Sequence, residues 1–325
     1  MAYIVFIAII LLLSAWSLYI TRREKRSFRS WGSEKLLQLR LKRGWFHGRE
    51  DSERFLALQE VKNEQPFVMP TPLKLLAIVE RRTIEGLDCV VLKERTFVGK
   101  THILYLHGGA YVEHPILPHW LFLDRINNQV KGTIIVPIYP KAPVHTVLES
   151  FDKFVALYRK LIDDGIDAKD IVVMGDSAGG GLALALSQQL ALDSVALPKE
   201  VILISPWLDI TLRNAAIPRM VHKDPMLNRQ HLQRMGKAWA GPLDPSDRKT
   251  SPINGQLRGL PRLSLFIGTH ELLLPDARKF RLLCIRNGVK IDYFEYPKMN
   301  HDFPLFPIPE AKQALKEIVA IITRA

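Results

Sequence analysis

The stretch from residue 170 to residue 181 constrains the fold of this chain more than any other part of the sequence. It begins with the apolar run 171–174, which is typical of a strand buried on both faces. The pentapeptide Gly-Asp-Ser-Ala-Gly follows at 175–179, and the Leu- and Ala-rich residues from 182 onward favour a helix. A serine between such a strand and such a helix predicts a sharp, strained turn that presents the Ser177 hydroxyl at the end of the strand. The flanking glycines fit this turn because strand and helix approach too closely there for side chains.

The chain beyond residue 75 predicts a mostly parallel sheet. Short apolar or alternating segments are separated by helical patterns, and the first two segments are joined by a Glu-Gly turn. The expected strands cover 76–84, 87–92, 102–106, 133–138, 171–174, 201–204, 263–267 and 291–296. Strands that alternate with helices predict an α/β fold with eight strands and helices on both faces of the sheet. The segment 207–250, with an expected helix at 228–240, interrupts this rhythm and is interpreted as a cap over the carboxyl ends of the strands.

A reactive serine needs hydrogen-bond donors for the negative charge that develops on the carbonyl oxygen it attacks. The expected strand 102–106 ends in His107-Gly108-Gly109, where no Cβ atom shields the two glycine N–H groups. We expect the N–H groups of Gly108, Gly109 and Ala178 to form this oxyanion hole. His107 and Asp176 are expected to support it, His107 by holding the loop in place.

The serine also needs a base, and the base needs an acid that orients it. Glu271 lies three residues after the glycine that ends the strand 263–267, and His301 lies in the loop after the last expected strand. Asp276 is the alternative acid, and His270 is the weaker alternative base. The chain order Ser177, Glu271, His301 is the nucleophile–acid–base order known for serine hydrolases built on a parallel sheet.

Residues 2–20 contain no charged side chain and are rich in Ile, Leu, Val, Phe and Ala. A helix of this length would span about 28 Å, which is close to the hydrocarbon thickness of a bilayer. A signal peptide carries positive charge before its apolar run, whereas here the basic residues follow it. We therefore expect a transmembrane helix at 1–21, with a cleaved signal peptide or a buried core helix as the alternatives.

The formal net charge of +12 is concentrated just after this apolar run. Residues 22–49 hold ten Lys and Arg against two Glu and so supply +8 of the +12. The remainder is only mildly basic, which argues against a nucleic-acid partner. The bias of Lys and Arg predicts a single-pass protein of the cell membrane whose catalytic domain lies in the cytoplasm and whose basic arm lies on anionic lipid. The expected organisation is a transmembrane anchor at 1–21, a basic juxtamembrane arm and cap segment at 22–74, and a catalytic domain at 75–325.

The cysteine content points to neither a disulfide framework nor a metal site. Cys89 and Cys284 are the only cysteines, and neither has the spacing of metal ligands or of a catalytic thiol. We expect no metal and no cofactor.

Several short motifs within residues 76–303 occur together. They are His107-Gly108-Gly109, Ala142-Pro143, Gly175-Asp176-Ser177-Ala178-Gly179-Gly180, Ser205-Pro206-Trp207, Ser251-Pro252 and the loops of Glu271 and His301. In these motifs the chain resembles the hormone-sensitive-lipase-like carboxylesterase family of the α/β-hydrolase superfamily. The resemblance implies an α/β-hydrolase fold and hydrolysis of short- to medium-chain carboxylic esters through an acyl-enzyme on Ser177, without a cofactor.

Two positions depart from the family pattern. Ala110 stands where a third loop glycine is often present, which could narrow the acyl side of the site. Glu271 stands where the family usually has Asp, and its side chain reaches one methylene further. Three alternatives stay open: a lipase, an amidase or deacetylase acting on membrane-associated substrates, and a non-catalytic binding protein of the same fold. The oligomeric state is not indicated.

Overall fold

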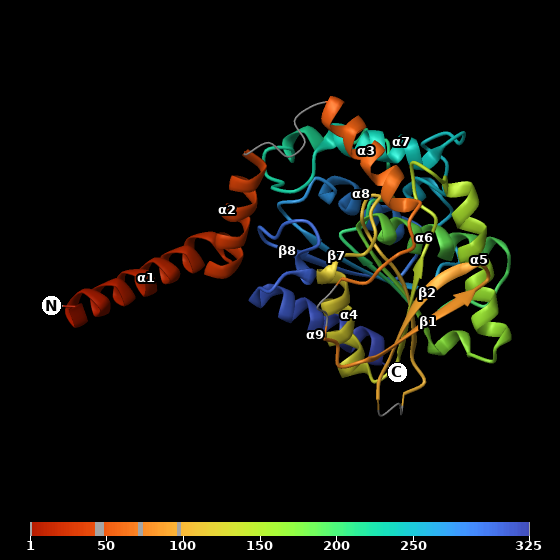
Figure 1. The fold of residues 1–325 in the computed structure, drawn as a ribbon, viewed down its shortest axis with the longest axis horizontal. Coiled ribbons are helices and arrows are strands. Elements are labelled where there is room, and N and C mark those ends of the chain that lie inside the picture. Colours follow the sequence, from red (N-terminus) through yellow and green to blue (C-terminus); the bar gives the residue numbers. More distant parts are fainter. Residues whose placement is uncertain (1, 43–48, 71–73, 96–98, 325) are drawn as a thin grey trace.

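The computed structural model of this chain describes residues 2–42, 49–70, 74–95 and 99–324, and it is built around one eight-stranded sheet (Figure 1). The strands are β1 (Ile78–Ile84), β2 (Leu87–Lys93), β3 (His102–Leu106), β4 (Thr133–Ile138), β5 (Ile171–Asp176), β6 (Glu200–Ile204), β7 (Arg262–Gly268) and β8 (Ile291–Tyr296). Their order across the sheet is β1-β2-β4-β3-β5-β6-β7-β8. β1 pairs antiparallel with β2 and β2 with β4, whereas every other neighbouring pair is parallel. The prediction of eight strands in a mostly parallel sheet is confirmed.

Helices cover both faces of this sheet, so that each face has its own hydrophobic core. The helices that follow β3 in the chain are α4 (Leu117–Val130), α5 (Val147–Asp163), α6 (Ser177–Leu192), α7 (Arg229–Ala240), α8 (Leu274–Arg286) and α9 (Pro309–Thr323). Short 3-10 turns lie at Ala168–Asp170, Ile217–Arg219, Pro252–Asn254 and Phe303–Leu305. One core joins the sheet to α5, α6, α7 and α8, and the other joins it to α4 and α9. The central strand β5 is buried along its whole length because its side chains alternate between these two cores.

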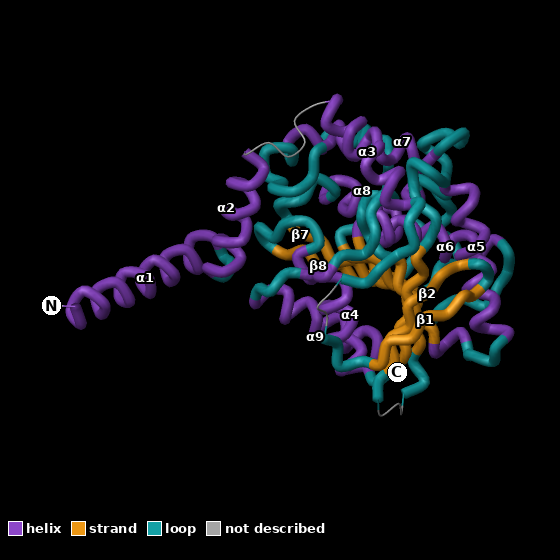
Figure 2. The backbone as a smooth tube through the Cα atoms, viewed as in Figure 1, coloured by secondary structure: helices purple, strands orange, loops and turns teal. Residues whose placement is uncertain are grey.

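Among the described residues, three helices precede the sheet: α1 (Ala2–Glu24), α2 (Phe28–Lys42) and α3 (Arg49–Asn63). α1 extends away from the body of the protein, whereas α3 lies beside α7 of the 207–250 segment (Figure 2). At the end of α3, the Asn63 side chain donates to the carbonyls of Val112 (2.9 Å) and Ala142 (3.0 Å). The expected division at residues 21 and 74 stays a prediction.

The predicted transmembrane helix at 1–21 is wrong. In the parts of the chain that the structure describes, no helix combines the length and the apolar character needed to cross a membrane. The helix α1 continues past the apolar run into Arg22, Arg23 and Glu24. Its end also packs on the protein, since Ile20 is buried and the Trp16 ring lies 6.1 Å from the ring of Trp31 in α2. The apolar sequence alone did not reveal these contacts. The expected membrane contact and orientation were inferred from the same transmembrane helix and lose that basis.

The backbones of β5, α6 and β3 meet at two glycines. A Cβ atom on Gly175 would lie 2.3 Å from the carbonyl oxygen of Gly179, and one on Gly179 would lie 1.9 Å from the carbonyl oxygen of Leu106. Both partners are backbone atoms of buried elements, so neither can move aside without shifting β3 or α6. This contact sets the position of the first turn of α6 relative to the end of β3.

We predict that Gly179→Ala lowers the free energy of unfolding by more than about 3 kcal/mol, because the added methyl group overlaps backbone atoms in a packed interior. Gly32→Ala in α2 is the matched control, since a Cβ atom there meets nothing within 4 Å. Alanine is favoured over glycine inside a helix by about 1 kcal/mol, so this control should be neutral or stabilising. Urea unfolding curves of both variants measure the difference, and equal midpoints would contradict the close approach.

Candidate active site

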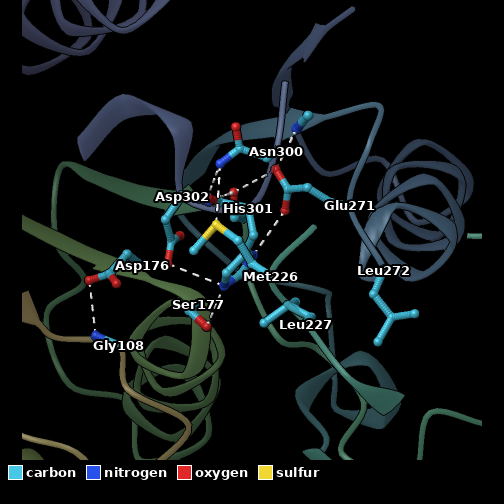
Figure 3. A network of polar contacts seen from close by, with 12 residues as sticks. Gly108, Asp176, Ser177, Met226, Leu227, Glu271, Leu272, Asn300, His301 and Asp302 are labelled. Atoms are coloured by element: carbon cyan, nitrogen blue, oxygen red, sulfur yellow. Dashed lines mark hydrogen bonds and ion pairs between the residues drawn. The ribbon is translucent and has the colours of Figure 1, made fainter. Parts of the chain in front are cut away.

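Loops at the carboxyl ends of three parallel strands bring Ser177, His301 and Glu271 together (Figure 3). Ser177 follows β5, Glu271 follows β7 and His301 follows β8. The Ser177 Oγ lies 2.9 Å from His301 Nε2, and His301 Nδ1 lies 3.1 Å from Glu271 Oε2. These three residues, chosen from the sequence, therefore form one continuous hydrogen-bonded chain.

Ser177 has the strained backbone that its sequence context predicts. Its φ of 51° lies in the left-handed region, which a residue with a Cβ atom rarely adopts. The carbonyl of Ser177 accepts a hydrogen bond of 2.8 Å from the N–H of Trp207, which ties the turn to the loop after β6. The side chain is thereby fixed at the start of α6, where free N–H groups of the first helical turn favour negative charge.

The Glu271 carboxylate is fully buried and both of its oxygens are engaged. Oε1 accepts hydrogen bonds from the Gly268 N–H (2.6 Å) and from the Ser205 hydroxyl (2.8 Å), while Oε2 faces His301 Nδ1. A carboxylate at Nδ1 favours the tautomer that carries its proton there. His301 Nε2 is then free to accept the proton of the Ser177 hydroxyl.

The two alternative residues lie elsewhere. Asp276 accepts a hydrogen bond of 2.9 Å from the Asn214 amide, and burial raises the pKa of its carboxyl group to about 6. His270 Nδ1 lies 2.6 Å from Glu34 Oε1 in helix α2. The structure gives neither residue a contact with Ser177 or His301, so the geometry favours Glu271 and His301.

Asp302 is a second carboxylate at the imidazole, and the sequence analysis did not identify it. Its Oδ2 lies 3.2 Å from His301 Nε2, on the side that also faces Ser177. Its backbone N–H donates to Ser205 Oγ at 3.1 Å, so Ser205 links the acid and the residue after the base. The Ser205-Pro206-Trp207 motif was the available signal for this link, but it does not name the partners of the hydroxyl.

Burial and the flanking carboxylates act on His301 in opposite directions. Burial alone would lower the pKa of the His301 imidazole, but the negative charges of Asp302 and Glu271 outweigh it and raise this pKa above its ordinary value. Asp302 in turn is partly buried and lies near the negative charges of Asp176 and Glu271, and these effects together raise the pKa of its carboxyl group. His301 and Asp302 thus compete for one proton at Nε2.

The expectation for Gly108 needs a correction. Its N–H donates to Asp176 Oδ1 at 2.9 Å and is therefore not available to an oxyanion (Figure 3). The next residues, Gly109 and Ala110, have φ values of 109° and 52°, and no hydrogen bond within the described parts of the chain uses their N–H groups. The glycine pair after the strand was a signal for the loop, but the sequence did not show which of its N–H groups bonds within the protein.

Asp176 is a fully buried carboxylate that holds this loop. Besides the Gly108 N–H, it accepts hydrogen bonds from the Tyr105 hydroxyl and from His119 Nε2, the latter at 3.1 Å. His119 Nδ1 accepts from the Ile116 N–H at 3.1 Å, so the ring carries its proton on Nε2, which faces Asp176. Burial would raise the pKa of the Asp176 carboxyl group, but these donors outweigh it and lower the pKa, so the group is ionised.

His107 lies behind the oxyanion loop rather than beside the serine. Its ring is fully buried, stacks on Tyr139 at 4.4 Å, and places Nδ1 2.7 Å from the Gly108 carbonyl. Burial lowers the pKa of this imidazole well below its ordinary value, so the ring is neutral. The Tyr139 hydroxyl donates to the His107 carbonyl at 2.9 Å and completes the support of the loop.

Across the described ranges, no group of three or more His, Cys, Asp or Glu side chains is arranged to hold a metal ion. Cys89 and Cys284 are both free and buried.

Comparison with known proteins places this geometry in a family. A family model described as alpha/beta hydrolase fold matches residues 103–305, a range that contains Ser177, Glu271 and His301. A protein named esterase from Acinetobacter venetianus is 34% identical over 224 residues, covering 68% of this chain and 74% of the relative. A protein named acetyl-hydrolase from Streptomyces hygroscopicus is 29% identical over 229 residues, covering 70% of this chain and 76% of the relative.

A solved structure gives the same result. The crystal structure of an esterase from the bacterial hormone-sensitive lipase family matches with a TM-score of 0.77 and 27% identity, over 89% of this chain and 95% of the other. The sheet order, the strained serine after β5 and the matched range agree with one another. The chain therefore belongs to the alpha/beta hydrolase fold family, in its hormone-sensitive-lipase-like branch.

Proposed function

We propose that this protein is a serine carboxylesterase that hydrolyses short- to medium-chain carboxylic esters. The observation that carries the proposal is the unbroken hydrogen-bonded chain from Ser177 Oγ through the His301 ring to Glu271, at distances of 2.9 and 3.1 Å. A buried serine hydroxyl that only stabilised the fold would not need a left-handed backbone or an imidazole oriented by a buried carboxylate.

The reaction follows from the position of each group. His301 Nε2 removes the proton of the Ser177 hydroxyl while Oγ attacks the ester carbonyl carbon, which gives a tetrahedral oxyanion. The imidazolium then donates the same proton to the alkoxide of the leaving alcohol, and an acyl-enzyme remains on Ser177. Water repeats the sequence with His301 as base and releases the carboxylic acid, while Glu271 keeps Nδ1 protonated throughout.

The oxyanion donors in this proposal are the N–H groups of Gly109, Ala110 and Ala178. The first two are unengaged after Gly108 has bonded to Asp176, and the third lies in the first turn of α6. Removal of one such donor typically costs about 10²–10³ in turnover. The methyl group of Ala110 would then stand at the edge of the oxyanion hole and favour small acyl groups.

The names of the relatives support the ester class and a small acyl group, since one is an esterase and another an acetyl-hydrolase. A fluorophosphonate label tests for a reactive serine, and p-nitrophenyl esters from acetate to palmitate test ester hydrolysis and the preferred length of the acyl group. The amide p-nitroacetanilide tests the amidase alternative. We expect labelling of Ser177 and the highest kcat/KM between acetate and hexanoate. A preference for palmitate would indicate a lipase, faster cleavage of the anilide an amidase, and the absence of both labelling and turnover a binding protein.

We predict that Ser177→Ala abolishes ester turnover and fluorophosphonate labelling, because it removes the hydroxyl that lies 2.9 Å from His301 Nε2. Thermal unfolding should be close to that of the wild type, since the substitution removes a single oxygen atom and adds no new one. Labelling of the mutant at the wild-type rate would show that the nucleophile is another residue.

We predict that Glu271→Gln lowers kcat by about 10³–10⁴, because an amide at Nδ1 favours the wrong imidazole tautomer. Asp276→Asn is the matched control, because this carboxylate pairs with Asn214 instead of the imidazole. Its kcat should stay within about threefold of the wild type. Steady-state kinetics on one ester decide the ranking, and a larger loss in the Asp276 variant would move the acid to that residue.

We predict that kcat/KM rises with pH and is half-maximal above about 6.5, because the base must be neutral and its pKa is raised. Asp302→Asn removes a negative charge at Nε2, which destabilises the imidazolium and lowers its pKa. The acid limb should therefore move to lower pH by about one unit or more. Asp193→Asn, which removes a surface carboxylate paired with Arg159, should leave the limb in place. If the acid side of the pH profile of kcat/KM is unchanged in the Asp302 variant, Asp302 and His301 do not compete for the proton at Nε2.

A further inference from the structure

We propose that an amino-terminal clamp, residues 24–34, positions the catalytic acid and base through a buried ion pair between Arg26 and Glu34. The inference rests on the proposed function and concerns two loops. The acid loop, residues 268–273, carries Glu271, and the base loop, residues 297–302, carries His301. The clamp touches both loops from outside and contacts no reacting atom, so Arg26 and Glu34 are positioning residues.

Arg26 binds the base loop. Its Nη1 donates to the carbonyl oxygen of Lys298 at 2.9 Å, three residues before His301. Ser30 lies beside the next residue, with its hydroxyl 3.5 Å from the sulfur of Met299. The Lys298 ammonium in turn pairs with Glu24 at 2.9 Å, so the base loop is held from both its backbone and its side chain.

Glu34 binds the acid loop. Its Oε1 lies 2.6 Å from Nδ1 of His270, the residue directly before the catalytic acid. Its Oε2 forms an ion pair with the Arg26 guanidinium. The side chains of Arg26 and Glu34 are each 3% exposed, so they form a buried ion pair that solvent ions screen little. Burial would raise the pKa of the Glu34 carboxyl group, but His270 and Arg26 outweigh it and keep the group ionised.

The two loops are also bonded to each other, which allows a displacement of one to reach the other. The His270 N–H donates to the Met299 carbonyl at 3.0 Å, and the Lys298 N–H donates to Thr269 Oγ1 at 2.6 Å. A Cβ atom on Gly268 would lie 2.1 Å from the Met299 carbonyl oxygen, so the loops are in backbone contact there. The Arg26–Glu34 pair joins the same two loops by a second route, because Arg26 bonds to Lys298 in the base loop and Glu34 contacts His270 in the acid loop.

The consequence for catalysis follows from the lengths of the hydrogen bonds. Proton transfer requires that Ser177, His301 and Glu271 stay within hydrogen-bond reach, and a displacement of about 1 Å can cost about 10²-fold in rate. Loss of the Glu34 charge leaves the buried Arg26 guanidinium with Glu24, at 3.2 Å, as its remaining ion-pair partner. It also weakens the contact of Glu34 with His270, so the acid loop is held less firmly against the base loop. The clamp should thus act on turnover through the alignment of acid and base, and not on the binding of the substrate.

The test is Glu34→Gln, which keeps the size of the side chain and removes the charge. We expect kcat for p-nitrophenyl acetate and the rate of fluorophosphonate labelling to fall about tenfold, with KM within about twofold. Glu310→Gln is the matched control. Glu310 anchors the same clamp through the N–H and hydroxyl of Ser27, but it belongs to helix α9 and contacts neither loop. This control should keep the wild-type kcat.

A double-mutant cycle with Arg26→Met covers the case in which a single variant folds poorly. The double variant Arg26→Met/Glu34→Gln has no unpaired buried charge, so it should fold, and its loss of kcat should be close to that of Glu34→Gln instead of the product of both losses. Wild-type kcat in both Glu34→Gln and the double variant, or an equal loss in Glu310→Gln, would overturn the inference. Failure of the wild type itself to hydrolyse esters or to label at Ser177 would overturn the proposed function instead.

Discussion

The buried carboxylate of Asp176 connects parts of the chain on which the candidate site depends. It directly precedes the nucleophile, and it accepts hydrogen bonds from the Gly108 N–H, the Tyr105 hydroxyl and His119. These donors come from the oxyanion loop, from β3 and from α4, so one ionised group fixes the serine turn relative to the loop that faces it. Each donor satisfies charge that would otherwise be costly to bury, and the same bonds hold the loop in a backbone conformation with three successive positive φ values.

The sequence predicted the parts of the site that depend on local patterns. Ser177, Glu271 and His301 each follow a recognisable strand, and the carboxyl ends of parallel strands meet at one edge of a sheet. The contacts that the sequence did not reveal join residues far apart in the chain, such as Asp176 to His119 and Arg26 to Lys298. The errors had the same origin, because neither the engaged N–H of Gly108 nor the packed end of α1 can be seen without the neighbours they contact.

Ser205 shows how the two halves of the site share one small group. Its hydroxyl donates to Glu271, the proposed acid, and accepts from the N–H of Asp302, the residue after the proposed base His301. Its own N–H donates to Phe266 in β7 at 2.7 Å, which fixes the residue to the sheet. Ser205 therefore holds Glu271 and Asp302, and through the same loop His301, in fixed positions relative to β6 and β7.

The contacts of Asn63 indicate how much of this chain is needed to keep the candidate site in its observed geometry. Its amide donates to the Val112 and Ala142 carbonyls, both in buried residues next to the oxyanion loop. Asn63 and the clamp both lie outside residues 103–305, the range that the family model matches. A fragment cut to that range would leave these carbonyls without their donor and the loops of the acid and base without their outer support. The smallest piece of this protein that can preserve the geometry of its site is larger than the range that the family model matches.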